Sequence, residues 1–266
     1  MHKKVMGFIV LSCIFILSAG CVSAPQESPS SQAAVTHKAV TPHYIVGVDA
    51  NFPPFASQDR DGNITGFDID ALRWIAGKEG FEVDFVSVPW DQAIPLLEAG
   101  NIDLIASGMM VNDERRERVN FSQPYYTVSL GVAIRDGTGI VIQDIYDGRI
   151  KVGAQAGTAE AAWIVENLIK TGKMPASNLS LYPDITNLTR NLEEGNVDAA
   201  IIQSPTLQQD IAGRPVVVIG TILSDQKIAY AVRKSDPELL ARIDEGLSQL
   251  MKDPLWDQLK QQYGLE

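Results

Sequence analysis

The sequence has little cysteine and little histidine, and both are confined to its beginning. The two cysteines are Cys13 and Cys21, and the three histidines are His2, His37 and His43. The long stretch after His43 therefore offers no thiol for a disulfide bond or a thiolate metal site. It also offers no imidazole, which argues against a zinc site and against acid–base catalysis by histidine.

An apolar run preceded by basic residues opens the chain. Lys3 and Lys4 precede about 16 mostly apolar residues that end in Leu17-Ser18-Ala19-Gly20, directly before Cys21. This order is typical of an export signal, and a cysteine at this place predicts a lipoprotein signal. The alternative, an uncleaved transmembrane anchor, needs about 20 apolar residues. We therefore expect residues 1–20 to be removed and Cys21 to carry a lipid that holds the protein at the outer face of the cell membrane.

The composition changes after Cys21 and again near His43. Residues 22–42 are rich in Ser, Pro, Ala, Thr and Gln, which predicts a flexible tether over residues 21–43. The remainder is long enough for one large domain or two modest lobes. The chain has 22 basic and 33 acidic residues and a net charge of −11, or −13 without Lys3 and Lys4. So acidic a protein is not expected to bind nucleic acid or to spread over an anionic lipid surface.

Two phrases of the sequence occur twice, in the same order. VGVD at residues 46–49 resembles VGAQ at 152–155, and LEAGNID at 97–103 returns as LEEGNVD at 192–198. The first pair predicts short buried strands that end in a polar residue. The second predicts a helix end, a glycine in the left-handed C-cap position and entry into a strand. The repeat indicates two α/β lobes with the same core plan and mostly parallel sheets.

Several polar side chains are candidates for helix starts. Asp68 or Asp70 can cap a helix that runs to Glu79, Asp91 can cap the next one, and Thr158 can cap a third. In parallel sheets, ligands bind beyond the carboxyl ends of the strands. Pairing the two lobes face to face would bring four such strand ends around one cleft. The residues that follow those strands are Asp49 to Phe52, Ser107 to Met110, Gln155 to Glu160, and Gln203.

Short motifs spread over residues 44–264 match a known family. Gly66-Phe67-Asp68-Ile69-Asp70 is similar to its signature, although Ala71 stands where a larger aliphatic residue is usual. On these motifs the chain resembles the family 3 extracellular solute-binding proteins, receptors of polar amino-acid ABC importers. The further matches are Gly47-Val48-Asp49 with Phe52 and Pro54-Phe55, Asp113-Glu114-Arg115-Arg116, Phe121-Ser122-Gln123-Pro124-Tyr125, and Gly157-Thr158.

The resemblance implies a periplasmic-binding-protein-like fold, with two α/β lobes joined by two hinge strands and a ligand cleft between the lobes. It implies a first lobe of residues 44–130 and 227–266 and a second of residues 131–226. It also implies that the lobes close over the ligand by a hinge motion.

The resemblance assigns a carboxylate clamp to Arg115. A planar guanidinium offers two parallel, charge-assisted hydrogen bonds to a carboxylate. The residues alone favour the alternative that Arg115 is one of several charges on a solvated helix face. Backbone N–H groups at a helix start also bind anions, so we expect Ala159 and the Thr158 region to meet the same carboxylate. Thr158 can serve as an N-cap at the same time.

The other end of the ligand is expected to meet aromatic and polar side chains. Phe52 and Trp90 resemble the two aromatic positions that sandwich the ligand side chain in this family, and Met109 would add a soft wall. Asp49 and Gln155 occupy corresponding positions in the two lobes and should reach the far end. Glu160 can join them, although the helix dipole also explains an acidic residue there. An aspartate beside two aromatic rings favours a cationic or amide side chain, hence Arg, Lys, His or Gln as ligand.

Two positions depart from the family pattern. Met110 and Gln203 stand where the resembling proteins usually place a hydroxyl and an aspartate that bind the α-ammonium group. A buried ammonium without its carboxylate is costly. Either the ligand is an amino acid whose amine uses the Gly108 carbonyl, Gln203 and an acidic neighbour, or it is a carboxylate without a standard α-amino group.

The function predicted is that of a receptor with no cofactor and no metal, acting as a monomer with an ABC permease and ATPase. Two rival functions share the fold. An exported enzyme similar to cyclohexadienyl dehydratase would need a poised acid or base, for which Glu160 and Asp49 are the candidates. A tethered sensor domain would have to signal through another protein.

Overall fold

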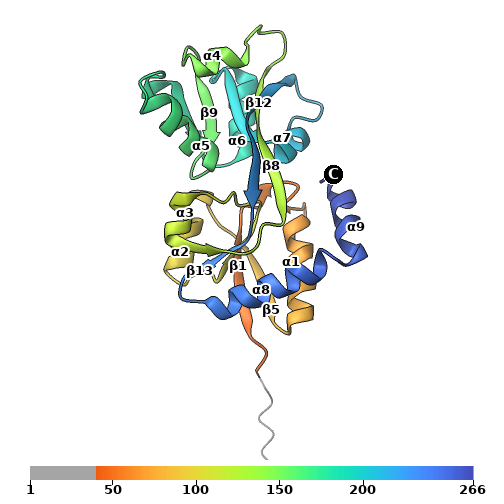
Figure 1. The fold of residues 1–266 in the computed structure, drawn as a ribbon. Helices are drawn as coiled ribbons and strands as arrows, with labels where there is room; N and C mark the ends of the chain where they lie inside the picture. Colours follow the sequence, from red (N-terminus) through yellow and green to blue (C-terminus); the bar gives the residue numbers. More distant parts are fainter. Residues whose placement is uncertain (1–39, 266) are drawn as a thin grey trace, which may run out of the picture. The chain divides into compact units, whose positions relative to one another are not determined.

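The computed structural model describes residues 40–265. The expected signal peptide, the expected lipid acceptor Cys21 and most of the expected tether lie outside the described residues. Within residues 40–265, no helix is both long enough and apolar enough to span a bilayer. The described part forms two α/β lobes, each built around its own sheet (Figure 1).

The first lobe is built around a five-stranded sheet of mixed direction. β1 pairs in parallel with β5 and β6, whereas β13 runs antiparallel to β6 and β7. In sheet order the strands are β5 (Glu82–Ser87), β1 (His43–Val48), β6 (Leu104–Ile105), β13 (Ala231–Arg233) and β7 (Val119–Phe121). The helices are α1 (Phe67–Glu79), the 3₁₀ turn η1 (Trp90–Gln92), α2 (Ala93–Glu98), α3 (Asp113–Arg118), α8 (Pro237–Leu250) and α9 (Pro254–Tyr263). A small antiparallel sheet contains β2 (Asn51–Phe52), β3 (Ala56–Gln58) and β4 (Ile64–Thr65).

The sheet of the second lobe also has three parallel strands, but two long antiparallel strands complete it. β9 pairs in parallel with β10 and β11, and the antiparallel pair β8 and β12 continues the sheet. In sheet order the strands are β10 (Leu179–Tyr182), β9 (Val152–Gln155), β11 (Ala199–Gln203), β8 (Tyr126–Arg135) and β12 (Val216–Ile228). The helices are α4 (Ile142–Tyr146), α5 (Ala159–Ile164), the π-helical turn η2 (Val165–Ile169), the 3₁₀ turn η3 (Ala176–Asn178), α6 (Ile185–Glu194) and α7 (Ser204–Asp210).

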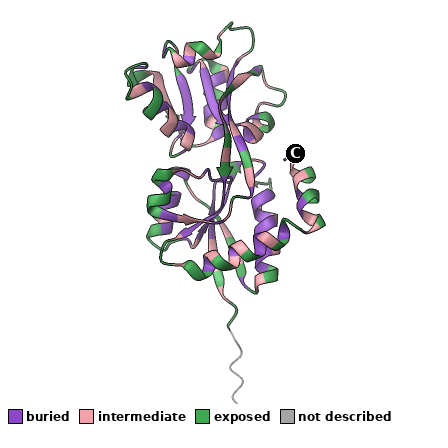
Figure 2. Cartoon of the chain, in the orientation of Figure 1, coloured by how far each residue is buried: buried purple, intermediate pink, exposed green. Residues whose placement is uncertain are grey.

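The repeated phrases of the sequence lie where the core plan requires them. The 46–49 and 152–155 phrases end β1 and form β9, the central parallel strands of the two sheets. The second phrase ends α2 and α6, and the glycines that follow, Gly100 and Gly195, have φ of 76° and 82°. This left-handed conformation suits glycine because a Cβ would be strained there. The buried strands lie at the centre of each lobe in Figure 2, which confirms the two-lobe α/β prediction.

Two expected helix caps are wrong. α1 begins at Phe67, one residue before Asp68, and Gly66 occupies the N-cap position. Asp68 is instead fully buried, because its carboxylate accepts backbone N–H groups of another segment. Asp91 lies inside η1, and α2 begins two residues later at Ala93.

Two long strands run between the lobes. β8 and β12 pair with each other along most of their length, and both belong to the sheet of the second lobe (Figure 1). The end of β12 also pairs with the first lobe: Val111 N–H donates to the Lys227 carbonyl (2.8 Å), and the N–H of Ala229, the residue after β12, donates to the Met109 carbonyl (3.1 Å). These strands are the candidates for the two hinges, and the exact division of the lobes within them stays a prediction.

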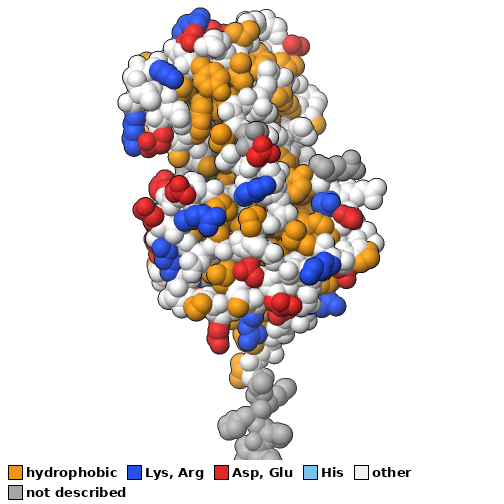
Figure 3. All heavy atoms as spheres, viewed as in Figure 1, with side chains coloured by type: hydrophobic (Ala, Val, Ile, Leu, Met, Phe, Trp, Pro, Cys, Tyr) orange, Lys and Arg blue, Asp and Glu red, His pale blue; other side chains and the backbone are white. Residues whose placement is uncertain are grey.

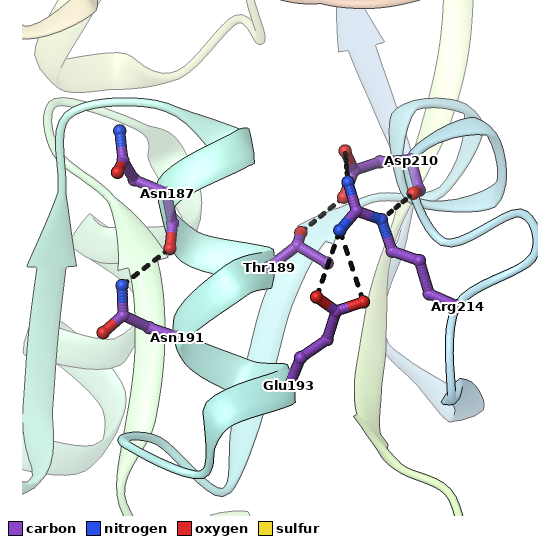
Figure 4. Close-up of polar contacts among 6 residues, drawn as sticks. All are labelled: Asn187, Thr189, Asn191, Glu193, Asp210 and Arg214. Atoms are coloured by element: carbon purple, nitrogen blue, oxygen red, sulfur yellow. Dashed lines mark hydrogen bonds and ion pairs between the residues drawn. The ribbon is translucent and has the colours of Figure 1, made fainter.

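A polar cluster joins α6 to the end of α7 in the second lobe (Figure 4). Arg214 donates to the Asp210 carbonyl (2.7 Å) and pairs with the Glu193 carboxylate (3.2 Å). The Asp210 carboxylate also accepts from the hydroxyl of Thr189, which is buried. The cluster fixes the two helices that flank β11, the strand that ends in Gln203.

Candidate ligand-binding site

Arg115 lies between the two lobes and is almost fully buried. It belongs to α3, whose N-cap Asn112 accepts the Arg115 N–H (2.8 Å). Its guanidinium donates from Nη1 to the Met110 carbonyl (2.7 Å) and from Nη2 to the Gly157 carbonyl of the second lobe (2.9 Å). Burial lowers the pKa of Arg115, and the nearby Glu160 carboxylate opposes that effect. A buried guanidinium therefore faces the start of α5.

The start of α5 is formed as the sequence predicted. Thr158 is the N-cap: its hydroxyl accepts the Ala161 N–H (3.2 Å) and donates to the Gln155 carbonyl (2.7 Å). Ala159 is the first residue of the helix, and Glu160, the second, is buried. Burial raises the pKa of Glu160, although its own backbone N–H and the charge of Arg115 favour the ionised form. The helix start thus places an acidic side chain near Arg115, and the N–H of Ala159 is the group of the first turn for which a ligand is the expected acceptor.

Asp49 and Gln155 meet across the lobes. Gln155, at the end of β9, donates from Nε2 to Asp49 Oδ2 (2.5 Å) and to the Pro183 carbonyl (3.1 Å). Burial raises the pKa of Asp49, whereas the hydrogen bond from Gln155 favours its ionised form. Both side chains are more than nine-tenths buried, and Gln155 Oε1 has no hydrogen-bond partner among residues 40–265.

A second amide bridge joins the lobes at Gln203. Gln203 Nε2 donates to the Gly108 carbonyl of the first lobe (3.1 Å), while its Oε1 is buried and has no partner within the described chain. Gly108 and Ser107 form a turn with positive φ values of 65° and 103°. The Ser107 hydroxyl donates to the Asp49 carbonyl (3.1 Å), which links this turn to the end of β1. The side chain of Met110 is buried, and it is its carbonyl that contacts Arg115.

A cavity of about 250 Å³ lies between the lobes at Arg115. Trp90 and Met109 line it, and the Arg115 guanidinium carbon lies 6.0 Å from the centre of the Trp90 ring. Phe52 packs elsewhere, against Phe55, with ring centres 6.2 Å apart. A sandwich of the ligand between Phe52 and Trp90 therefore stays a prediction.

On one wall of this cavity the sequence reasoning named only Thr158. The same face of α5, extended into η2, also lines the cavity with Ala161, Ala162 and Val165. Positions three, four and seven residues apart share a helix face, so the spacing from Thr158 could have indicated these residues. Opposite them, Asp91 and Ile94 come from η1 and α2, where the sequence singled out only Trp90 as a contact.

Charged side chains are interspersed by sign on the surface that surrounds these lobes, as the face in Figure 3 shows. Among residues 40–265, no three side chains of His, Cys, Asp or Glu gather into a cluster that could hold a metal ion. Of the residues that the sequence singled out, Trp90, Met109, Arg115 and Thr158 line the cavity. The acids Asp49 and Glu160 and the amides Gln155 and Gln203 are buried but do not line it. One buried cation, two buried acids and two amides have the chemistry to bind a small zwitterionic molecule, and their contact with a ligand stays a prediction.

Comparison with known proteins decides the family. The sequence model of the family described as "bacterial extracellular solute-binding proteins, family 3" matches residues 44–266. The chain belongs to this family. The match covers the whole described fold of this family 3 solute-binding protein apart from its first four residues.

Three similar proteins show which ligands and roles are described for relatives of this chain. A probable histidine-binding protein of Campylobacter jejuni is 29% identical over 270 residues and covers 100% of both chains. An ancestral arginine-binding protein, solved bound to arginine, is 29% identical with a TM-score of 0.76, covering 83% of this chain and 97% of its own. An ancestral amino-acid-binding protein described as a precursor of cyclohexadienyl dehydratase is 31% identical with a TM-score of 0.74, covering 83% and 95%.

Proposed function

We propose that this protein is the extracytoplasmic receptor of an ABC importer and that it captures a small polar amino acid by hinge closure. The observation that carries the proposal is the position of Arg115. Its guanidinium is buried and donates to one backbone carbonyl in each lobe. The guanidinium can form both hydrogen bonds only when the two lobes lie close together.

The ligand carboxylate belongs on Arg115. The two hydrogen-bond acceptors of the Arg115 guanidinium are neutral carbonyls, and among the described residues the nearby acids Glu160 and Glu114 act on it through their charge alone. A buried cation is poorly compensated by neutral groups alone. A ligand carboxylate would supply a counter-charge that is hydrogen-bonded directly to the guanidinium, and it would also accept the Ala159 N–H at the start of α5.

The amide oxygens indicate what else the ligand carries. Gln155 and Gln203 both use Nε2 for carbonyl or carboxylate acceptors, which leaves each Oε1 as a buried acceptor. A buried acceptor without a donor is costly, so the ligand should bring N–H groups to both. An amino acid with an α-ammonium group and a donor at its far end, such as Arg, Lys, His or Gln, meets this need. A carboxylate without an α-amino group would leave Gln203 Oε1 unpaired.

The partners follow from the proposed role. An ABC permease with its ATPase would take the ligand from the closed receptor, and a lipid on Cys21 would keep a monomeric receptor near that permease. The extracellular or periplasmic location of the family supports this placement.

A dehydratase is the second candidate function. It rests on the likeness to the dehydratase precursor and on Glu160, whose buried carboxyl with a raised pKa would suit a general acid. The relatives matched along the whole chain are binding proteins, which favours the receptor. If the protein converts a cyclohexadienyl acid and the variant Glu160→Gln does not, the dehydratase would become the favoured function.

The variant Arg115→Ala tests the receptor directly. Calorimetric titration with L-arginine, L-lysine, L-histidine and L-glutamine should show that the variant binds its best ligand about a hundredfold more weakly or worse, because one partner of a buried charge pair is lost. Arg116→Ala is the matched control, since Arg116 is the next residue of α3 and is exposed. Equal affinities of Arg115→Ala and the original protein would refute the assigned clamp.

A further inference from the structure

Asp68 is a fully buried acid on α1, a helix that contributes no residue to the wall of the cavity. Its Oδ2 accepts the N–H of Ser107 (2.6 Å), the N–H of Gly108 (2.8 Å) and the hydroxyl of Tyr125 (2.8 Å). Its Oδ1 is buried and has no hydrogen-bond partner among residues 40–265. A single carboxylate oxygen thus holds two successive backbone N–H groups, an arrangement that binds anions.

The Ser107–Gly108 turn, which Asp68 holds, is a part of the first lobe that contacts the second lobe. Ser107, a non-glycine residue, has a positive φ of 103°, a conformation that persists only where the surroundings impose it. The Gly108 carbonyl then accepts from Gln203, and the Met110 carbonyl, two residues on, accepts from Arg115. The hydrogen bonds of Asp68 therefore hold the turn that carries one interlobe acceptor, the Gly108 carbonyl, and that leads to the Met110 carbonyl, which accepts from Arg115 within the first lobe.

We propose that Asp68 is a positioning residue for ligand capture: its ionised carboxylate holds the Ser107–Gly108 turn in the geometry that Gln203 and Arg115 need, and protonation of Asp68 weakens ligand binding. The binding part of this inference rests on the proposed function. Asp68 acts through the turn and touches no ligand. Protonation leaves an oxygen that still accepts, but hydrogen bonds to an ionised acceptor are roughly twice as strong as those to a neutral one.

The electrostatic surroundings allow this proton to move near neutral pH. Burial raises the pKa of Asp68 to about 6, and the hydrogen bonds from Tyr125, Gly108 and Ser107 limit the rise. The other titratable groups that face it are Tyr125 and Tyr230, whose pKa values lie well above 10 because both are buried. On α1 itself, Asp70 pairs with Arg73 and accepts from Tyr263. Between pH 7.5 and 5 the charge of Asp68 therefore changes, whereas Tyr125 and Tyr230 stay neutral.

Hydrogen exchange of the Ser107 and Gly108 amides, followed by NMR on the ligand-free protein, tests the positioning step. The variant Asp68→Asn places an amide oxygen where Oδ2 lies and removes the charge at every pH. After correction for intrinsic rates, exchange in the original protein should be about tenfold faster at pH 5 than at pH 7.5. In Asp68→Asn it should be fast at both. Asp70→Asn, the same charge change on the same helix, should behave as the original protein. Equal protection in the original protein and Asp68→Asn at pH 7.5 would overturn the inference.

Calorimetry with L-arginine tests the effect on binding. The dissociation constant of the original protein should rise about tenfold between pH 7.5 and 5, while that of Asp68→Asn should be raised at both values. Burial also raises the pKa values of Asp49 and Glu160, but both residues are present in both proteins, so the ratio of the two constants isolates Asp68. A ratio that stays constant with pH would overturn the binding part. Failure of the original protein to bind L-arginine would count against the proposed ligand class, and the exchange data would still decide the role of Asp68.

Discussion

At the scale of single residues, Gln203 joins the lobes through a neutral amide. Its Nε2 donates to the Gly108 carbonyl, and a carboxylate at this position would instead repel that carbonyl. The amide therefore lets the lobes approach without a charged group of the ligand between them. Its free Oε1 remains available for a ligand N–H.

Replacing Gln203 tests whether the ligand carries an α-amino group. In Gln203→Leu, the affinity for the best amino-acid ligand should fall about tenfold or more, because a buried hydrogen bond to a charged group is lost. The affinity for the corresponding 2-oxo acid should fall less, because that ligand is affected only by the loss of the interlobe bridge from Gln203 to Gly108. Gln208→Leu, an exposed position on α7, serves as the control in the same calorimetric titrations. A larger loss for the 2-oxo acid than for the amino acid would contradict this reading of Gln203.

At the scale of elements, the turn before α5 brings the backbones of the two lobes close together. Gly157 has φ of 74°, and a Cβ on it would lie 2.5 Å from the Asp91 Cα of the first lobe. Its carbonyl accepts from Arg115. Glycine is therefore required here for two reasons, the left-handed conformation and the proximity of another backbone.

The pair Gly157→Ala and Gly172→Ala separates these two reasons. Gly172 has nearly the same φ, 73°, but a Cβ on it would meet no atom within 4 Å. Both variants should lose about 1 kcal/mol of unfolding free energy, measured by urea titration, because alanine is strained at positive φ. Ligand affinity should fall, about tenfold or more, in Gly157→Ala alone, because the lobes can no longer meet. Equal affinities of the two variants would show that close approach at Gly157 is not needed.

Local sequence patterns predicted helix ends correctly where neighbouring residues alone determine the backbone conformation. The glycines after α2 and α6 and the Thr158 cap act within one turn of chain, so they can be recognised from neighbouring residues. The start of α1 was predicted wrongly because Asp68 forms its hydrogen bonds with a segment 39 residues away. Such a partner leaves no mark in the local sequence.

At the scale of the whole molecule, the candidate site depends on the approach of two lobes. The bridges from Gln155 to Asp49 and from Gln203 to Gly108 join residues 106 and 95 positions apart. The repeat in the sequence indicated that both lobes place polar residues at strand ends, and the family resemblance named the residues. Neither could indicate that the two amides would bridge the lobes directly, since that depends on the relative position of two separate sheets.

The most direct test of the account is a thermal-shift screen of the purified protein against amino acids and their deaminated analogues. A ligand that binds only the folded state raises the melting temperature by mass action. We predict a clear rise with at least one of L-arginine, L-lysine, L-histidine and L-glutamine, and none with the corresponding acids that lack the α-amino group. A rise only with the deaminated acids, or with none of these compounds, would contradict an amino-acid receptor built around Arg115 and Gln203.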